Sequence, residues 1–145
     1  MDEPPDVGDR GTELDELGLV GALQRLAEGI GADGRGPHIS VDVPVGLPPL
    51  TAAAEVAAYR VAQEALTNVV RHADARTATV RLTVDPRSLT VSVEDDGTGL
   101  PDDVVAGVGL SSMRERTAEM GGTCAVQRVP GGGTRVQVVL PRGEE

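Results

Sequence analysis

Lysine is absent from this sequence of 145 residues, and aromatic residues are nearly so, with one Tyr, no Phe and no Trp. Single-stranded nucleic acids are bound largely by stacking of bases on aromatic side chains, so the composition argues against this mode of recognition. All 13 basic residues are Arg, they face 23 acidic residues, and the formal net charge is −10. Because such a field repels DNA and anionic lipid, an anionic ligand needs local attraction from a metal ion, a helix N-terminus or a few Arg side chains.

Cysteine and long apolar runs are equally scarce. Cys124 is the one cysteine, which excludes an internal disulfide and a cysteine-based metal cluster. It lies in an apolar run, where we predict a buried small side chain in a reducing compartment. No apolar run approaches the roughly 18 residues of a membrane-spanning helix, and the acidic, Pro-rich N-terminus is unlike a secretion signal. We therefore expect a cytoplasmic chain without membrane contact of its own.

The length leaves room for one domain with a single core. Residues 1–12 combine Pro, Gly and charge without periodicity, which predicts a disordered tail or leader. Apolar residues then recur every three positions and predict a helix over residues 13–31 that ends near two glycines. The residues of this apolar stripe are Leu14, Leu17, Val20, Leu23 and Leu26.

The remaining pattern predicts strands joined by tight turns, with two more helices between them. Alternation indicates strands at 38–43, 77–84, 88–94, 123–129 and 134–140, and apolar periodicity indicates helices at 51–73 and 110–120. Hairpin connections imply a mostly antiparallel sheet. The predicted fold is α+β, a two-layer α/β sandwich with helices on one face of the sheet.

Polar residues on the long predicted helix form the first candidate site. Glu64 and Asn68 stand one turn apart, about 40° round the helix and roughly 6 Å along its axis. A carboxylate and an amide oxygen at this spacing can hold a hard cation such as Mg²⁺, directly or through water. Arg71 and His72 follow one turn later, from where they can reach phosphate oxygens. A solvated helix face is the alternative, which the modest helix propensity of Asn disfavours.

A segment rich in Asp and Gly follows the strand that ends at Glu94. The segment reads Glu-Asp-Asp-Gly-Thr-Gly over residues 94–99. A carboxylate at a strand end can accept a hydrogen bond from an exocyclic amine such as that of adenine, and glycines let the backbone approach a flat ring. An ordinary Asp-Gly turn would explain the same residues.

Two glycine-rich motifs lie nearer the C-terminus. The first, Gly-Val-Gly-Leu over residues 107–110, enters a predicted helix, where free N–H groups and the helix dipole favour a phosphate. The second, Gly-Gly-Gly-Thr over residues 131–134, predicts a hairpin turn whose Thr134 can also line a pocket. Each motif alone is weak evidence for a ligand, because helix entries and hairpin turns are common.

The order of the four motifs resembles the ATPase superfamily shared by DNA gyrase, MutL and histidine kinases. Glu-x-x-x-Asn-x-x-x-His, Asp-x-Gly-x-Gly, Gly-x-Gly-Leu and Gly-x-Gly-Thr are similar to its successive boxes, from about residue 47 to residue 142. The run Gly-Leu-x-x-Met-Arg-Glu-Arg resembles sensor kinases related to the nitrate sensors and the lipid-fluidity sensor. The resemblance implies the Bergerat ATP-binding fold, with a connector helix over 13–31 and an ATPase-like core over 37–142 within a catalytic domain of residues 13–145.

The resemblance also implies a role for each matching residue. Asn68 would ligate Mg²⁺ and Glu64 would lie on or near the water shell of the metal, so these two are the expected catalytic and metal-binding residues. Asp96 would accept the adenine amine. The other expected ATP contacts are Arg71 and His72 at the phosphates, Gly97, Gly99, Gly107, Gly109 and Leu110 in the nucleotide lid, and Thr134 at the adenine pocket.

ATP as substrate, and a histidine on a separate dimerisation domain as acceptor, follow from the same resemblance, with a response regulator downstream. Acceptor histidines of this family precede Asp, but His38 precedes Ile39 and His72 precedes Ala73. We therefore expect the chain to lack its acceptor and to be part of a kinase that is cytoplasmic or anchored in the inner membrane. An anti-sigma-factor-type serine kinase and a non-catalytic nucleotide-binding module are the alternatives.

Overall fold

A single mixed sheet forms one layer of the molecule in the computed structural model, which describes residues 5–32, 34, 36–97 and 111–142. The strand order within these residues is β1-β2-β3-β5-β4. The strands are β1 His38–Asp42, β2 Thr77–Val84, β3 Ser88–Asp95, β4 Thr123–Arg128 and β5 Thr134–Pro141. β1 pairs with β2 in parallel, and the remaining pairs are antiparallel. This confirms the predicted α+β fold with a mostly antiparallel sheet.

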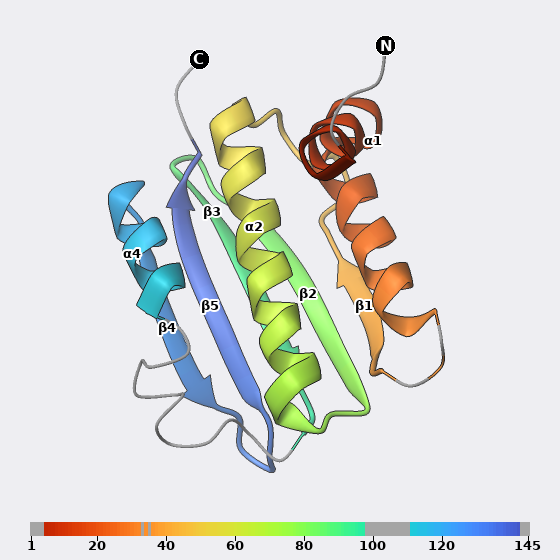
Figure 1. Ribbon diagram of the computed structural model, residues 1–145. Helices are drawn as coiled ribbons and strands as arrows, with labels where there is room; N and C mark the ends of the chain where they lie inside the picture. The colour runs from red at the N-terminus through yellow and green to blue at the C-terminus, as the bar shows by residue number, and fades with distance from the viewer. Residues whose placement is uncertain (1–4, 33, 35, 98–110, 143–145) are drawn as a thin grey trace.

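Helices cover one face of this sheet, with α2 across its middle and α1 and α4 on either side (Figure 1). The helices are α1 Pro5–Gly31, α2 Ala52–Asn68, the π-helix η1 Val69–Ala73 and α4 Ser111–Glu119. The core lies between the two layers. Leu89, Val91 and Val93 alternate along β3 toward the helices and are at most 2% exposed, and Ala62 and Leu66 of α2 are fully buried.

The long predicted helix over residues 51–73 is divided into two kinds of helix. Thr51 caps α2 as expected, because its side chain accepts a hydrogen bond from the Ala54 N–H at 3.1 Å. After Asn68 the chain continues as η1, and Asp74 then ends the helical path with φ of 52°. The π-helix places the residues after Asn68 at other angles than the 100° steps assumed for an α-helix.

The first helix differs from the prediction at its start. α1 begins at Pro5, so residues 5–12 are helical where the sequence predicted a disordered tail, and proline is well suited to the first turn of a helix. The helix is kinked at Gly18, whose φ of 71° and ψ of 177° are accessible mainly to glycine. Beyond the kink, Leu19 and Leu23 pack into the core at 2% and 1% exposure.

Two features of the fold relate to expectations from composition: the length and apolar character of its helices, and the burial of Cys124. Among the described residues no helix has both the length and the apolar character to cross a membrane. Cys124 is a free thiol in β4 that is half-buried rather than buried, and desolvation raises its pKa.

Candidate functional site

The end of β3 holds a buried carboxylate. Asp95 continues the alternation of β3 toward the helices, and it is 5% exposed. Its Oδ1 accepts a hydrogen bond from the Gly97 N–H at 2.9 Å, and the backbone N–H of Thr134 also donates to its carboxylate. Burial raises the pKa of Asp95, although both hydrogen bonds act in the opposite direction. A carboxylate fixed in this way can accept a hydrogen bond from an amine of a ligand.

The neighbouring Asp96 is exposed, and its carboxylate ties the end of β3 to the start of β2. Oδ1 accepts from the backbone N–H groups of Arg76 and Thr77 at 2.9 and 3.0 Å, and Oδ2 accepts from the Thr77 hydroxyl at 2.9 Å. These bonds, chiefly those from Thr77, lower the pKa of Asp96. Successive residues of an extended chain point to opposite faces, so Asp96 points away from the helix layer that Asp95 faces. This geometry does not support the predicted adenine contact of Asp96.

A signal for Asp95 was also present in the sequence, although the prediction selected its neighbour Asp96. In Asp-x-Gly-x-Gly, the carboxylate stands two positions before the first glycine, and two positions before Gly97 is Asp95. The strand pattern agrees, since Asp95 has the same parity as the apolar residues of β3. The motif spacing and the strand alternation, each applied strictly, both select Asp95 rather than Asp96.

The turn between β4 and β5 lies against the backbone of Asp95. Gly131, Gly132 and Gly133 all have positive φ, at 90°, 118° and 93°. A Cβ atom at Gly133 would overlap the Asp95 carbonyl, so a side chain there is excluded by contact as well as by conformation. Thr134, predicted to line a pocket, is 1% exposed and lies beside Asp95 at the start of β5.

The end of α2 carries the other predicted centre. Asn68 is the last residue of α2, and its Nδ2 is buried without a hydrogen-bond partner among the described residues. Leaving such a donor unpaired costs about 1–3 kcal/mol, so it marks a place suited to a polar ligand. One turn earlier, Glu64 is partly buried, and its Oε1 accepts from Nη1 of Arg116 on α4 at 3.0 Å.

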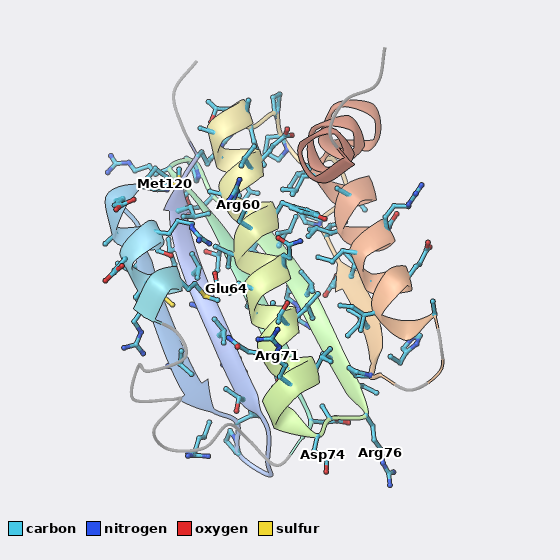
Figure 2. All side chains as sticks on the ribbon, in the orientation of Figure 1. Arg60, Glu64, Arg71, Asp74, Arg76 and Met120 are labelled. Atoms are coloured by element: carbon cyan, nitrogen blue, oxygen red, sulfur yellow. The ribbon has the colours of Figure 1, made fainter. Side chains whose placement is uncertain are left out.

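These groups meet at one edge of the sandwich. η1 leads from the end of α2 into the start of β2, which pairs with the end of β3, which in turn pairs with the start of β5 (Figure 1). Asn68, Asp95 and Thr134 therefore share this edge. Arg71 is exposed on η1 beyond Glu64 along the same helical path (Figure 2).

Several predicted ATP contacts lie where the structure gives little or no description. His72 belongs to η1, but its side chain is outside the described part of the chain. Gly97 is described and donates its N–H to Asp95. The predicted contacts Gly99, Gly107, Gly109 and Leu110 are all outside the described residues.

The side chains of Glu64 and Asn68 at the end of α2 fit a cation that is also bound by oxygens of another molecule. No group of three His, Cys, Asp or Glu side chains suited to a metal occurs within the described ranges. A cation would therefore rely on Asn68, Glu64 and oxygens of a bound molecule. Mg²⁺ commonly binds in this manner, through one or two protein groups together with substrate phosphates and water.

Comparison with known proteins finds related sequences along most of this chain. Residues 53–144 match the family described as histidine kinase-, DNA gyrase B-, and HSP90-like ATPase. The chain is 36% identical over 134 residues to the signal transduction histidine-protein kinase/phosphatase UhpB of Salmonella typhimurium, covering 92% of this chain and 26% of UhpB. It is 35% identical over 134 residues to the sensor histidine kinase NarS of Mycobacterium tuberculosis, covering 88% of this chain and 30% of NarS.

A solved structure gives the same result for the fold. The histidine kinase domain of the blue-light activated histidine kinase EL346 from Erythrobacter litoralis superposes with a TM-score of 0.69 at 28% identity, covering 90% of this chain and 69% of that chain. The chain spans less than a third of the length of UhpB or NarS. The family match, by contrast, covers most of this chain, from α2 to the last strand. The chain therefore belongs to the family of histidine kinase-, DNA gyrase B- and HSP90-like ATPases.

Proposed function

We propose that this chain binds Mg²⁺–ATP and donates the γ-phosphoryl group to a histidine on a separate dimerisation domain, as the catalytic part of a two-component sensor kinase that acts on a response regulator. The observation that carries the proposal is that the buried Asp95 and Thr134 share one edge of the sandwich with Asn68, whose buried amide nitrogen has no hydrogen-bond partner among the described residues. The names of UhpB and NarS, both histidine kinases, support the choice within the family.

Adenine recognition falls to Asp95 in this proposal and no longer to Asp96. The Asp95 carboxylate is fixed by the Gly97 and Thr134 N–H groups and would accept a hydrogen bond from the exocyclic amine of adenine. Burial disfavours its charged form, and an amine donor offsets part of that cost when the nucleotide binds. A purine with a carbonyl in place of this amine would leave two acceptors facing each other, so we expect selectivity against it.

The triphosphate would lie toward the end of α2. Asn68 and Glu64 are the proposed Mg²⁺-binding residues. Arg71, His72 and the lid glycines are proposed to approach the phosphates. Bound Mg²⁺ supplies neutralisation of the charge on the triphosphate. In the transfer, an imidazole nitrogen of the acceptor forms a bond to the γ-phosphorus while the bond from that phosphorus to the β–γ bridging oxygen breaks, and ADP leaves. The contribution of this chain is positioning and electrostatic stabilisation.

Nucleotide binding tests the adenine assignment with a matched pair of variants. Calorimetry with ATP and Mg²⁺ is expected to give micromolar-range or weaker binding for the unsubstituted chain. Asp95→Asn should lower the affinity by about tenfold or more, because loss of a hydrogen bond to a charged acceptor in a buried site is costly. Asp96→Asn should stay within about threefold, because that side chain is exposed and already bonded to Arg76 and Thr77. Loss of binding in Asp96→Asn but not in Asp95→Asn would reverse the assignment.

Transfer tests the kinase assignment. The chain is incubated with γ-labelled ATP and a supplied histidine-bearing dimerisation domain, and the label is tested for the acid lability of phosphohistidine. We expect acid-labile label, and loss of that label in Asn68→Ala with an unchanged circular dichroism spectrum. Acid-stable label on serine would instead support a serine kinase, and ATP binding without any transfer would support a non-catalytic module.

A further inference from the structure

One ion pair joins α2, which carries the proposed metal-binding residues, to α4 on the flank of the sheet. Nη1 of Arg116 lies 3.0 Å from Oε1 of Glu64, and the side chains are 40% and 26% exposed. Both residues line a hollow of about 310 Å³ together with Arg60, Gln63 and Thr67. Arg60 and Glu64 lie along the same side of α2 (Figure 2). Arg116 therefore contacts the proposed site, although the motif analysis assigned it no ATP contact.

Both residues of this ion pair have buried neighbours on their own helices. On α4, Met113 is fully buried and Thr117 is 2% exposed, and the Thr117 hydroxyl donates to the Met113 carbonyl at 2.7 Å. Arg116 follows Met113 by three positions, so it leaves α4 at the rim of the buried face. On α2, Glu64 directly precedes Ala65, which is 1% exposed. The backbone positions of the two charged residues are thus set by packing and do not depend on the ion pair.

We propose that Arg116 is a positioning residue for Glu64 and that it orients the Glu64 carboxylate toward the metal-bound triphosphate. This inference rests on the proposed function, because orientation of Glu64 matters only if Glu64 acts on the metal or its water shell. In a chain with a net charge of −10, a triphosphate repels a nearby carboxylate. The guanidinium of Arg116 offsets this repulsion and restricts the rotamers of a flexible side chain.

A positioning role and a purely structural role predict different consequences. A partly exposed ion pair contributes little to stability, so its loss should hardly change the unfolding midpoint. A small displacement of a catalytic group, in contrast, slows a group transfer strongly. The turnover rate should therefore fall while ATP affinity and stability remain nearly unchanged.

The test compares Arg116→Gln, Arg116→Lys, Glu64→Gln and the double variant Glu64→Gln/Arg116→Gln with the unsubstituted chain. Arg81→Gln is the matched control, since Arg81 forms a similar pair of 2.9 Å with Asp42 on neighbouring strands. The rate constant and KM for ATP are measured for transfer to the supplied dimerisation domain, with thermal unfolding in parallel. A second readout, independent of transfer, is the gain in ATP affinity on addition of Mg²⁺.

We expect Arg116→Gln to lower kcat about tenfold with KM for ATP changed less than about twofold, and Arg116→Lys to restore most of the rate. The double variant should be no slower than Glu64→Gln, and the Mg²⁺-dependent gain in ATP affinity should stay within about twofold in Arg116→Gln, in keeping with the small change in KM. A transfer rate of Arg116→Gln equal to that of Arg81→Gln would overturn the positioning role but leave the proposed function standing. The same holds if the loss of rate in the double variant equals the product of the two single losses. A chain that binds no ATP would overturn the proposed function, and the role of Arg116 with it.

Discussion

Asp95 and Asp96 leave the chain on different faces at the end of β3, and their surroundings give two identical side chains different properties. Asp95 is buried against the helix layer, and desolvation raises its pKa. Asp96 is exposed and accepts three hydrogen bonds from Arg76 and Thr77, which lower its pKa. The first carboxylate is suited to a ligand that donates a hydrogen bond, and the second holds two strands together.

The stabilising role of Asp96 predicts a dependence on pH. A folded-state pKa below the ordinary value of 3.8 means that ionised Asp96 contributes stability above that value, and that this stability is lost as pH falls through the lower folded-state pKa. Asp96→Asn should therefore lower the urea midpoint at pH 7, and the difference from the unsubstituted chain should narrow below about pH 4. A difference of equal size at pH 7 and at about pH 3 would contradict this account.

At the scale of elements, the turn before β5 shapes the proposed adenine site. Three consecutive glycines with positive φ bring the backbone against the end of β3, and Gly133 approaches the Asp95 carbonyl too closely for any side chain. β3 and β5 are neighbouring strands, so this approach also places the Thr134 N–H on the Asp95 carboxylate. The turn is thus both a hairpin connection and part of the site.

Two alanine substitutions separate contact from conformation in this turn. Gly133→Ala and Gly131→Ala carry nearly equal backbone strain, because their φ values are 93° and 90°. At Gly131, however, no described atom lies within 4 Å of an added Cβ. We expect Gly133→Ala to lose about 2 kcal/mol more stability than Gly131→Ala, and to weaken ATP binding as well. Equal losses in denaturant unfolding would show that the overlap with Asp95 is relieved without cost.

At the scale of the whole molecule, charge decides how an anionic nucleotide can bind. The chain carries a net charge of −10, and ATP adds further negative charge, so binding depends on local neutralisation. Asn68 and Glu64 provide few ligands for a free cation, and the triphosphate would complete the set. Metal and nucleotide should therefore bind together, and each should bind only weakly without the other.

Thermal unfolding tests this coupling on the intact chain. Mg²⁺–ATP at about 100 times its Kd should add about 2.7 kcal/mol to the free energy of unfolding and raise Tm by several degrees. ATP with a chelator at the same concentration should give a clearly smaller shift. Asp95→Asn with the same concentration of Mg²⁺–ATP should retain at most about half of the stabilisation, about 1.4 kcal/mol for a tenfold loss of affinity. Equal shifts with Mg²⁺ and with chelator would contradict a role for the metal in binding.

The sequence by itself determined the types of the elements, their order and the antiparallel hairpins. These features depend on local periodicity and turn residues, as at Thr51, which caps α2, and in the alternation along β3. The order of the motifs was sufficient to indicate the family. The boundaries were less certain, since the helix at residues 5–12 and the π-helix after Asn68 have no strong local signal.

The tertiary structure alone decided which polar groups meet. Glu64 and Arg116 are 52 residues apart and come together because α2 and α4 pack side by side on the same sheet. Asp95 gains its character from burial and from the Thr134 N–H, which belongs to another strand. Desolvation and hydrogen bonding depend on neighbours in space, and a local pattern carries no record of those neighbours.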